Sequence, residues 1–142
     1  MTFTFSHDHL GITVTPDELE ATIAWYSRNL GFAVEQRFES HGTTFVFLTA
    51  HGVRIELLAG ASRRGVPTDD VFTSMDPSRL HHFCLAVEDL DAAVARLLEL
   101  DVPLIGGPVE IPEIGRRIAF VADDVGTVIE LSEPGARGSA RP

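Results

Sequence analysis

An internal repeat constrains the fold of this chain more than any other feature of its sequence. The segment His-Leu-Gly-Ile-Thr-Val at 9–14 returns as His-Phe-Cys-Leu-Ala-Val at 82–87, and Val-Arg-Ile-Glu-Leu at 53–57 returns as Val-Ile-Glu-Leu at 128–131. The segments recur in the same order and at nearly the same separation, which predicts two modules built on one plan. Each module carries one histidine and one glutamate at matching places: His9 and Glu56 in the first, His82 and Glu130 in the second.

Composition bounds the class of protein. The 142 residues are one domain's worth of chain, and a hydrophobic content of 44% is enough for a packed core. The net charge of -10 argues against nucleic acid and anionic membranes as partners, because clusters of Lys and Arg bind both. No apolar run approaches the ~20 residues of a spanning helix. The N-terminus does not resemble a secretion signal, and the single cysteine excludes an internal disulfide, so we expect a cytoplasmic protein.

The first module has the pattern strand, helix, strand, strand, strand. Thr15-Pro16-Asp17-Glu18 is typical of a helix start, with a hydroxyl cap, a proline at the first position and acids in the first turn. Apolar residues recur at helical spacing from Leu19 to Leu30, and Gly31 predicts the end of this helix. We expect strands at 8–14, 32–39, 43–50 and 53–59.

The second module repeats this order, with a helix expected over 89–100. Its strands are expected over 80–87, 103–110, 116–122 and 127–132. The connection between the modules carries a short helical turn begun by Thr68-Asp69-Asp70. The predicted organisation is one structural domain with a first module at 1–60, a linker at 61–79, a second module at 80–134 and a flexible tail at 135–142.

Strand periodicity places the repeated His and Glu side chains on one face. The residues at 10, 12 and 14 are apolar and form a face that a helix can cover, so His9 points the other way. The same alternation applies to His82, and each glutamate lies between two apolar neighbours. His81 is the alternative ligand if the register slips by one, but its side chain is then expected to point toward the helix layer. We therefore favour His82.

With these features the chain resembles the vicinal oxygen chelate superfamily, which includes glyoxalase I, methylmalonyl-CoA epimerases, extradiol dioxygenases, and fosfomycin and bleomycin resistance proteins. The resemblance covers residues 8–133 and includes the repeated strands, Trp25-Tyr26 and Leu30-Gly31-Phe32. It implies an α+β fold in which two βαβββ modules form an open, cupped mixed β-sheet with helices outside. For members that bind a metal ion, it implies that the ligands are His9, Glu56, His82 and Glu130.

Departures from the patterns of these families bear on the choice of branch. Methylmalonyl-CoA epimerases carry an acidic base in the third strand of the first module, where this chain has Phe45, and a longer Gly-rich turn than residues 123–126. Both departures count against an epimerase. The groups with which glyoxalase I grips glutathione have no matching set here. Bleomycin-binding proteins usually lack the metal residues, and extradiol enzymes use two His and one Glu, so Glu56 fits them less well.

The donor set predicts the chemistry of the site. Two imidazoles and two carboxylates suit a divalent Ni, Co, Zn, Mn or Fe ion. Six-coordination leaves two positions for a substrate with neighbouring oxygens, and the ion would act there as a Lewis acid. By analogy with glyoxalase I, a glutamate that loosens from the ion would serve as the base. Glu130 is the first choice for this role and Glu56 the second.

Further residues are candidates for a substrate pocket on the same face. Arg54 shares strand parity with Glu56, and it either holds an anionic group or pairs with that glutamate. Cys84 shares parity with His82, and it either lines the site or is an inert core residue. The apolar candidates, for which core packing is an equal alternative, are Phe45, Phe47, Ile118 and Phe120.

Three functions follow from these features. The leading hypothesis is a metal-dependent glyoxalase-like lyase or isomerase acting on a small molecule chelated through neighbouring oxygens. The second is a non-catalytic protein that binds an antibiotic or aromatic metabolite, and the third is an iron-dependent extradiol-type dioxygenase. Superfamily members usually pair and open sheets have edges that need cover, so we expect a homodimer, with the site formed within one chain or across the dimer.

Overall fold

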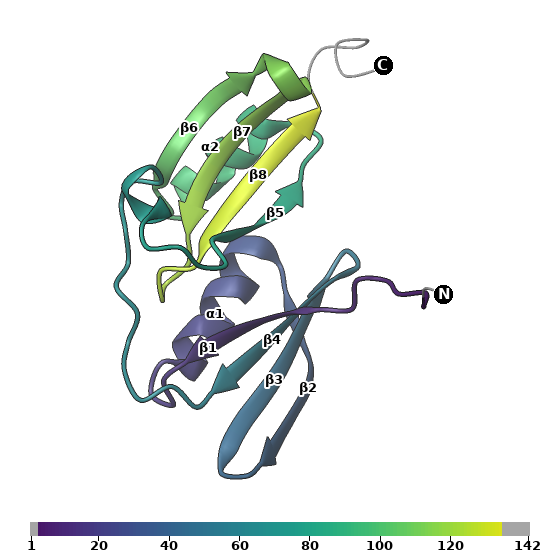
Figure 1. The fold of residues 1–142 in the computed structure, drawn as a ribbon, viewed down its shortest axis with the longest axis vertical. Helices are drawn as coiled ribbons and strands as arrows, with labels where there is room; N and C mark the ends of the chain where they lie inside the picture. The colour runs from purple at the N-terminus through teal and green to yellow at the C-terminus, as the bar shows by residue number, and fades with distance from the viewer. Residues whose placement is uncertain (1–2, 135–142) are drawn as a thin grey trace. The chain divides into compact units, whose positions relative to one another are not determined.

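The computed structural model describes residues 3–134 and divides the chain into two units, Met1–Arg64 and Gly65–Pro142. Each unit has the order β-α-β-β-β and one four-stranded mixed sheet (Figure 1). The predicted α+β fold with two repeated βαβββ modules is therefore confirmed. Residues 65–79, assigned to a linker from the sequence, belong to the second unit, and the predicted tail at 135–142 lies outside the described residues.

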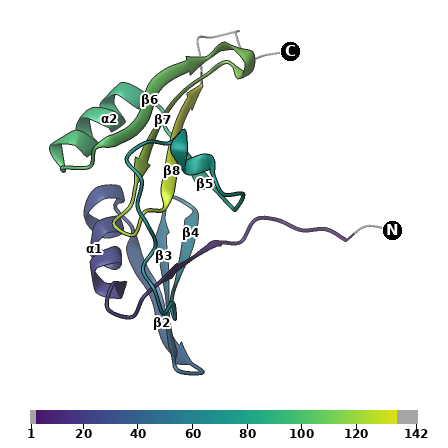
Figure 2. The same ribbon diagram turned by 60° about the vertical axis from the view of Figure 1, so that its left-hand side comes forward.

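In the first unit one helix covers one face of the sheet (Figures 1 and 2). The elements are β1 (Leu10–Val14), α1 (Leu19–Leu30), β2 (Ala33–Ser40), β3 (Thr43–Ala50) and β4 (Val53–Ala59). The strand order is β1-β4-β3-β2, with β1 parallel to β4 and the other pairs antiparallel. Alternate residues of β1 and β4 are buried, as the apolar spacing predicts, whereas no residue of the edge strand β2 is buried. Buried core side chains include Ile12, Val14, Tyr26, Val46, Leu48, Ile55 and Leu57.

Helix α1 begins later than its sequence signal predicts. Thr15 to Glu18 instead form a turn, closed by a hydrogen bond of 3.0 Å from the Glu18 N–H to the Thr15 carbonyl. The Glu18 carboxylate accepts the Thr15 N–H at 3.5 Å, so the cap residues stabilise the turn that leads into the helix. The predicted end is confirmed at Gly31, whose φ of 73° turns the chain so that the Phe32 N–H donates to the Tyr26 carbonyl at 3.1 Å.

The second unit repeats this architecture. Its elements are β5 (His82–Ala86), α2 (Leu90–Glu99), β6 (Leu104–Ile111), β7 (Arg116–Ala122) and β8 (Val128–Pro134), with 3-10 turns η1 (Thr73–Met75) and η2 (Pro112–Ile114). The strand order is β5-β8-β7-β6, with β5 parallel to β8. The Asp89 side chain caps α2 by accepting the Ala92 N–H at 2.9 Å. In the part of the chain the structure describes, no helix is long and apolar enough to cross a membrane.

The register of the two sheets is the same around the repeated residues. In each unit the glutamate of the last strand lies opposite the residue that follows the histidine by two positions, and opposite a phenylalanine of the third strand. The register pairs are Gly11 with Glu56 and Phe47 with Glu56 in the first unit, and Cys84 with Glu130 and Phe120 with Glu130 in the second. The sequence repeat is thus a repeat of position in the sheet.

The segment before β5 packs on the second sheet and forms a short helical turn. The Val71 N–H donates to the Ile105 carbonyl at 2.9 Å, and these two side chains form a buried cluster with Val128. The turn η1 lies further along the chain than the predicted start at Thr68-Asp69-Asp70. Phe72 begins it, because its carbonyl accepts the Met75 N–H at 3.4 Å, and the Asp70 carbonyl accepts the Ser74 N–H. The turn holds a set of apolar residues against the sheet face that bears His82.

Candidate functional site

The first His–Glu pair lies on the open face of the first sheet. His9 Nε2 is 3.5 Å from Glu56 Oε1, and the glutamate side chain is 16% exposed. The other ring nitrogen of His9, Nδ1, is 2.6 Å from Asp8 Oδ2. The edge of the Phe47 ring meets the imidazole at a centroid distance of 5.3 Å and an angle of 89°. His9 is therefore held on two sides, with Nε2 directed at a carboxylate.

The second pair has a similar arrangement in the second unit, with a shorter His–Glu distance. His82 Nε2 is 2.8 Å from Glu130 Oε2, and Glu130 is again 16% exposed. His82 Nδ1 is 2.9 Å from Nδ1 of His81. Phe120 meets the His82 ring at 5.8 Å and 87°. In both pairs Nε2 is directed at the glutamate and a phenylalanine meets the ring edge-on, which agrees with the sequence repeat, whereas the partners of Nδ1 differ.

These contacts fit what metal-binding histidines require. A ligand histidine usually binds the ion through one nitrogen and donates a hydrogen bond from the other, which fixes the ring and its tautomer. Both histidines have such a partner at Nδ1 and a glutamate oxygen near Nε2. Among residues 3–134 no group of three or more His, Cys, Asp or Glu side chains lies together, so each unit offers two donors. Binding of one ion by His9, Glu56, His82 and Glu130 stays a prediction.

Arg54 lies beside the first pair but does not pair with Glu56. Its guanidinium donates to Glu35 Oε1 at 2.7 and 2.9 Å and to Asp8 Oδ2 at 3.2 Å, and it stacks over the Phe47 ring at 3.9 Å. The hydrogen bond from His9, followed by the charge of Arg54, lowers the pKa of the Asp8 carboxyl. Two carboxylates already balance the Arg54 charge, which makes it a weak candidate for holding an anionic substrate group.

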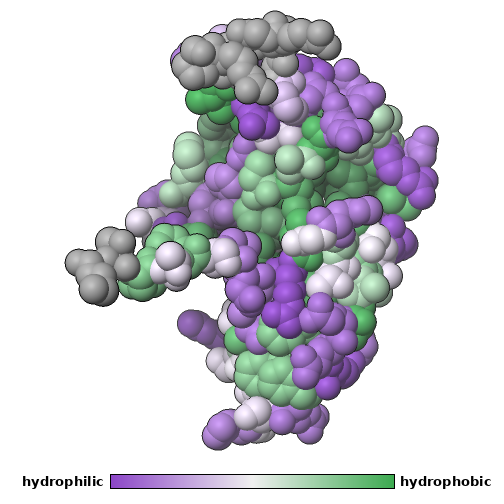
Figure 3. All heavy atoms as spheres, turned by 90° about the vertical axis from the view of Figure 1, so that its right-hand side faces the viewer, coloured by the Kyte–Doolittle hydropathy of each residue, from purple (hydrophilic) through white to green (hydrophobic). Residues whose placement is uncertain are grey.

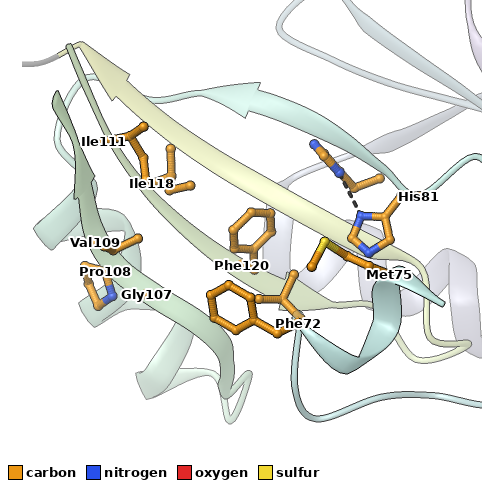
Figure 4. Close-up of a pocket in the computed structure, with 11 residues that line it drawn as sticks. Phe72, Met75, His81, Gly107, Pro108, Val109, Ile111, Ile118 and Phe120 are labelled. Carbon is orange, nitrogen blue, oxygen red and sulfur yellow. Dashed lines mark hydrogen bonds between the residues drawn. The ribbon is translucent and has the colours of Figure 1, made fainter. Parts of the chain in front are cut away.

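The structure corrects the expected direction of His81. Its Nε2 is 2.8 Å from the Ser74 hydroxyl, and the ring lines a cavity on the open face instead of pointing toward the helix layer (Figure 4). The expectation was wrong because β5 begins at His82, so the alternation of a strand does not extend to the residue before it. Burial, and then the neighbouring His82 and Arg79, lower the pKa of His81.

A cavity of about 540 Å³ opens on the face of the second sheet that bears His82. Its wall is formed by β6 and β7 on one side and by the segment around η1 on the other, and Phe72 and Phe120 lie close together inside it (Figure 4). Figure 3 shows hydrophobic atoms in a hollow of the second unit, bordered by hydrophilic residues. Apart from the two histidines, the lining side chains are apolar: Val71, Phe72, Met75, Pro108, Val109, Ile111, Ile118 and Phe120.

The predicted pocket residues fall into three places. Ile118 and Phe120 line this cavity. Cys84 lies opposite Glu130 in the register and is exposed, so it is not a core residue, and it is not part of the cavity wall. The other three, Phe45, Phe47 and Arg54, lie on the open face of the first unit.

An aromatic row on the open face of the first unit includes one residue that sequence reasoning missed. The ring of Phe38 on β2 stacks on Phe45 at 5.0 Å and lies 6.4 Å from Phe47. Phe45 therefore occupies the open face of β3, at the position where epimerases carry an acidic base.

Sequence reasoning also missed the residues of the segment before β5. The sequence feature that could have identified them is a group of apolar residues within a stretch rich in Gly, Ser and Pro: Val71, Phe72 and Met75.

Comparison with known proteins identifies the family. The model of the Glyoxalase/Bleomycin resistance protein/Dioxygenase superfamily matches residues 8–120, and the chain belongs to this superfamily. The chain is 34% identical over 131 residues to the ethylmalonyl-CoA/methylmalonyl-CoA epimerase of Cereibacter sphaeroides, covering 89% of this chain and 96% of the relative.

Solved structures show the same fold at lower identity. TnmS3, an antibiotic binding protein from Streptomyces sp. CB03234, matches with a TM-score of 0.69 and 24% identity, covering 94% of this chain and all of that one. A variant of the fosfomycin resistance protein FosX from Listeria monocytogenes, complexed with Mn(II) and 1S,2S-dihydroxypropylphosphonic acid, matches with a TM-score of 0.70 and 15% identity. That match covers 96% of this chain and 97% of the other.

Proposed function

We propose that this protein is a metal-dependent isomerase of the epimerase type, which moves a proton at the carbon next to the carbonyl of a small acyl thioester. The observation that carries the proposal is the His–Glu pairing at the same register position in both units. The 34% identity to an acyl-CoA epimerase supports the isomerase branch over the lyase branch. The proposal requires that the two pairs act in one site, within a chain or across a dimer.

Epimerisation needs a group that removes the proton and a group that returns it to the opposite face of the carbon. The duplicated module offers two equivalent carboxylates for this, Glu130 and Glu56, each mostly shielded from solvent beside an aromatic ring. Phe45 stands where an acidic base would be expected on β3, which leaves the proton transfer to these glutamates. A divalent ion, when bound, would polarise the substrate carbonyl and so acidify the neighbouring carbon.

The surroundings of Glu130 suit a base and a substrate with an apolar part. His82 at 2.8 Å and the Phe120 side chain hold the carboxylate in a sheltered position. The cavity next to His82 has a volume of about 540 Å³ and apolar walls, which would take up the alkyl or acyl portion of a substrate. Glu130 would remove the proton, and Glu56, its equivalent in the repeat, would carry the returning one.

The test follows proton exchange and inversion together. The protein, loaded in turn with Ni, Co, Zn, Mn or Fe, is incubated with one epimer of methylmalonyl-CoA or ethylmalonyl-CoA in D2O. We expect the opposite epimer to appear with deuterium at the inverted carbon, measured by mass spectrometry. Glu130→Gln should lower the rate by about 10²–10⁴, the usual cost of losing a positioned base.

Glu99→Gln is the matched control, because Glu99 is an exposed residue of α2 whose side chain pairs with Arg96. It should leave the rate unchanged. Absence of exchange with every one of these ions, or full activity of Glu130→Gln, would contradict the epimerase proposal.

The apolar cavity also favours a second candidate, a non-catalytic protein that binds a flat aromatic compound. The antibiotic binding protein TnmS3 has this fold, and Phe72 and Phe120 offer ring faces to a planar ligand. Calorimetry with aromatic antibiotics and metal-free protein tests this candidate. Micromolar affinity that a Phe120→Ala substitution removes, with no turnover of acyl thioesters, would favour binding over catalysis.

A further inference from the structure

We propose that Ser74 and His81 form a hydrogen-bond relay that presents Nε2 of His82 as the metal-binding nitrogen. The inference rests on the metal site proposed above and assigns a positioning role to two residues outside the predicted ligand set. The relay runs from the backbone at Val71 through Ser74 and His81 to His82, and its last contact is the one drawn in Figure 4.

The direction of the relay follows from its first member. The Ser74 hydroxyl has one hydrogen, and it contacts the Val71 carbonyl, which can only accept. Ser74 Oγ must therefore accept at its other contact, the one of 2.8 Å with His81 Nε2. A neutral His81 that donates from Nε2 has its lone pair on Nδ1.

The same logic passes through the second contact to the predicted ligand. His81 Nδ1 accepts, so His82 must donate from its own Nδ1 across the distance of 2.9 Å. A neutral His82 with hydrogen on Nδ1 has its lone pair on Nε2, 2.8 Å from Glu130 Oε2. Two acceptors at this distance need a cation or a proton between them, and a bound metal ion would supply the cation. The hydrogen-bond directions thus select, among the two tautomers of His82, the one that can bind a metal ion beside Glu130.

The relay is anchored in a buried part of the unit. Ser74 is 5% exposed, and its N–H donates to the Asp70 carbonyl. The Arg79 guanidinium donates to the Ser74 carbonyl. Val71, where the relay begins, belongs to the buried cluster with Ile105 and Val128. A buried, hydrogen-bonded serine cannot easily turn toward another partner, so it holds the orientation of the His81 ring.

The two units provide different hydrogen-bond partners for Nδ1 of the repeated histidine. His9 Nδ1 meets an exposed carboxylate of Asp8, whereas His82 Nδ1 meets a neutral imidazole backed by a buried hydroxyl. The relay therefore belongs to the second unit alone among these described contacts. Its loss should act on His82 without changing His9.

The first measurement is the affinity of metal-free protein for Co²⁺, by isothermal titration and visible absorption. Loss of a hydrogen-bond partner behind a ligand typically weakens metal binding about 10–100-fold, and we expect this for Ser74→Ala and for His81→Ala. In His81→Asn an amide oxygen can accept near the place of Nδ1, so affinity should largely return. His41→Asn makes the same substitution in the β2–β3 turn, where Asn tolerates the φ of 52°, and should change nothing.

The second measurement does not depend on affinity. Nitrogen-15 NMR of the protein loaded with Zn²⁺, which is diamagnetic, reports which nitrogen of His82 carries hydrogen and which one binds the ion. We expect hydrogen on Nδ1 and the ion on Nε2 in the wild type, and a mixture of tautomers in Ser74→Ala. An unchanged tautomer together with unchanged Co²⁺ affinity in Ser74→Ala and His81→Ala would overturn the relay.

His82→Ala separates this inference from the proposed function. If Co²⁺ affinity falls in His82→Ala but not in the Ser74 and His81 variants, the metal site stands and the relay is refuted. If Co²⁺ affinity is unchanged in His82→Ala, the metal site is refuted and the relay falls with it as a device for metal binding.

Discussion

A steric test of the segment that carries the relay is available at Gly106. A Cβ atom at this position of β6 would lie 2.6 Å from Val71 Cγ1 and 3.2 Å from Phe120 Cδ2. Overpacking of this kind costs about 1–3 kcal/mol, more than the ~0.4–1 kcal/mol gained by restricting the unfolded chain. We expect Gly106→Ala to lower the free energy of unfolding by about 1–2 kcal/mol.

The partner substitution should relieve this overlap. Val71→Ala alone removes two buried methyl groups from a side chain that is 7% exposed, which costs about 2 kcal/mol. With alanine at 71 the overlapping Cγ1 is gone, and the remaining Cβ lies at an ordinary 3.4 Å. The double variant should therefore be more stable than the sum of the single effects by about 1–3 kcal/mol.

Urea unfolding followed by circular dichroism measures all four proteins of this cycle. Leu57→Ala combined with Gly106→Ala is the control, because Leu57 is a core residue of the first unit and its effect should simply add. If the Gly106 and Val71 effects add within about 0.5 kcal/mol, the packing of residues 70–75 on β6 would be wrong, and with it the anchor of Ser74.

The remaining predictions concern titration, thiol reactivity and assembly. Because the pKa of the Asp8 carboxyl is lower in the folded protein than in the unfolded chain, its ionisation stabilises the fold at pH values above the unfolded-chain pKa, and this stabilisation is lost as the pH falls through the folded-state pKa. Asp8→Asn should therefore reduce the decrease in melting temperature below about pH 4. An unchanged decrease at acidic pH would argue against the His9 contact. Partial shielding of the thiol from solvent, and then the Glu130 carboxylate, raise the pKa of Cys84, although the residue as a whole is exposed. Glu130→Gln should consequently speed alkylation of Cys84 by iodoacetamide near pH 8. An unchanged alkylation rate would show that the Glu130 charge does not affect the pKa of the thiol. Light scattering should give the mass of two chains at micromolar concentration, and the mass of one chain would reject the homodimer.

Most of the fold was predictable because the hydrophobic periodicity and the residues that end helices and strands agree along the chain. The strand at 116–122 and the helix end at Gly31 match their sequence signals. The start of α1 was less predictable, because Thr15 and Glu18 bond to each other and stabilise a turn before the helix. Local bonds between cap residues compete with the first helical turn, and propensity alone does not decide which of the two forms.

In the candidate site, too, positions set by local rules were predictable and positions set by tertiary packing were not. The faces of His9 and His82 followed from strand alternation, which is a local rule, and the shared register explains why both glutamates lie beside them. The role of Ser74 could not be deduced in this way, because its contact with His81 depends on how an irregular segment folds back onto the sheet. That fold-back is set by burial of apolar side chains such as Val71, whose spacing in the sequence matches neither a helix nor a strand. The side chains predicted to bind an ion were therefore visible in the repeat, whereas the contacts behind them were visible only in the packed structure.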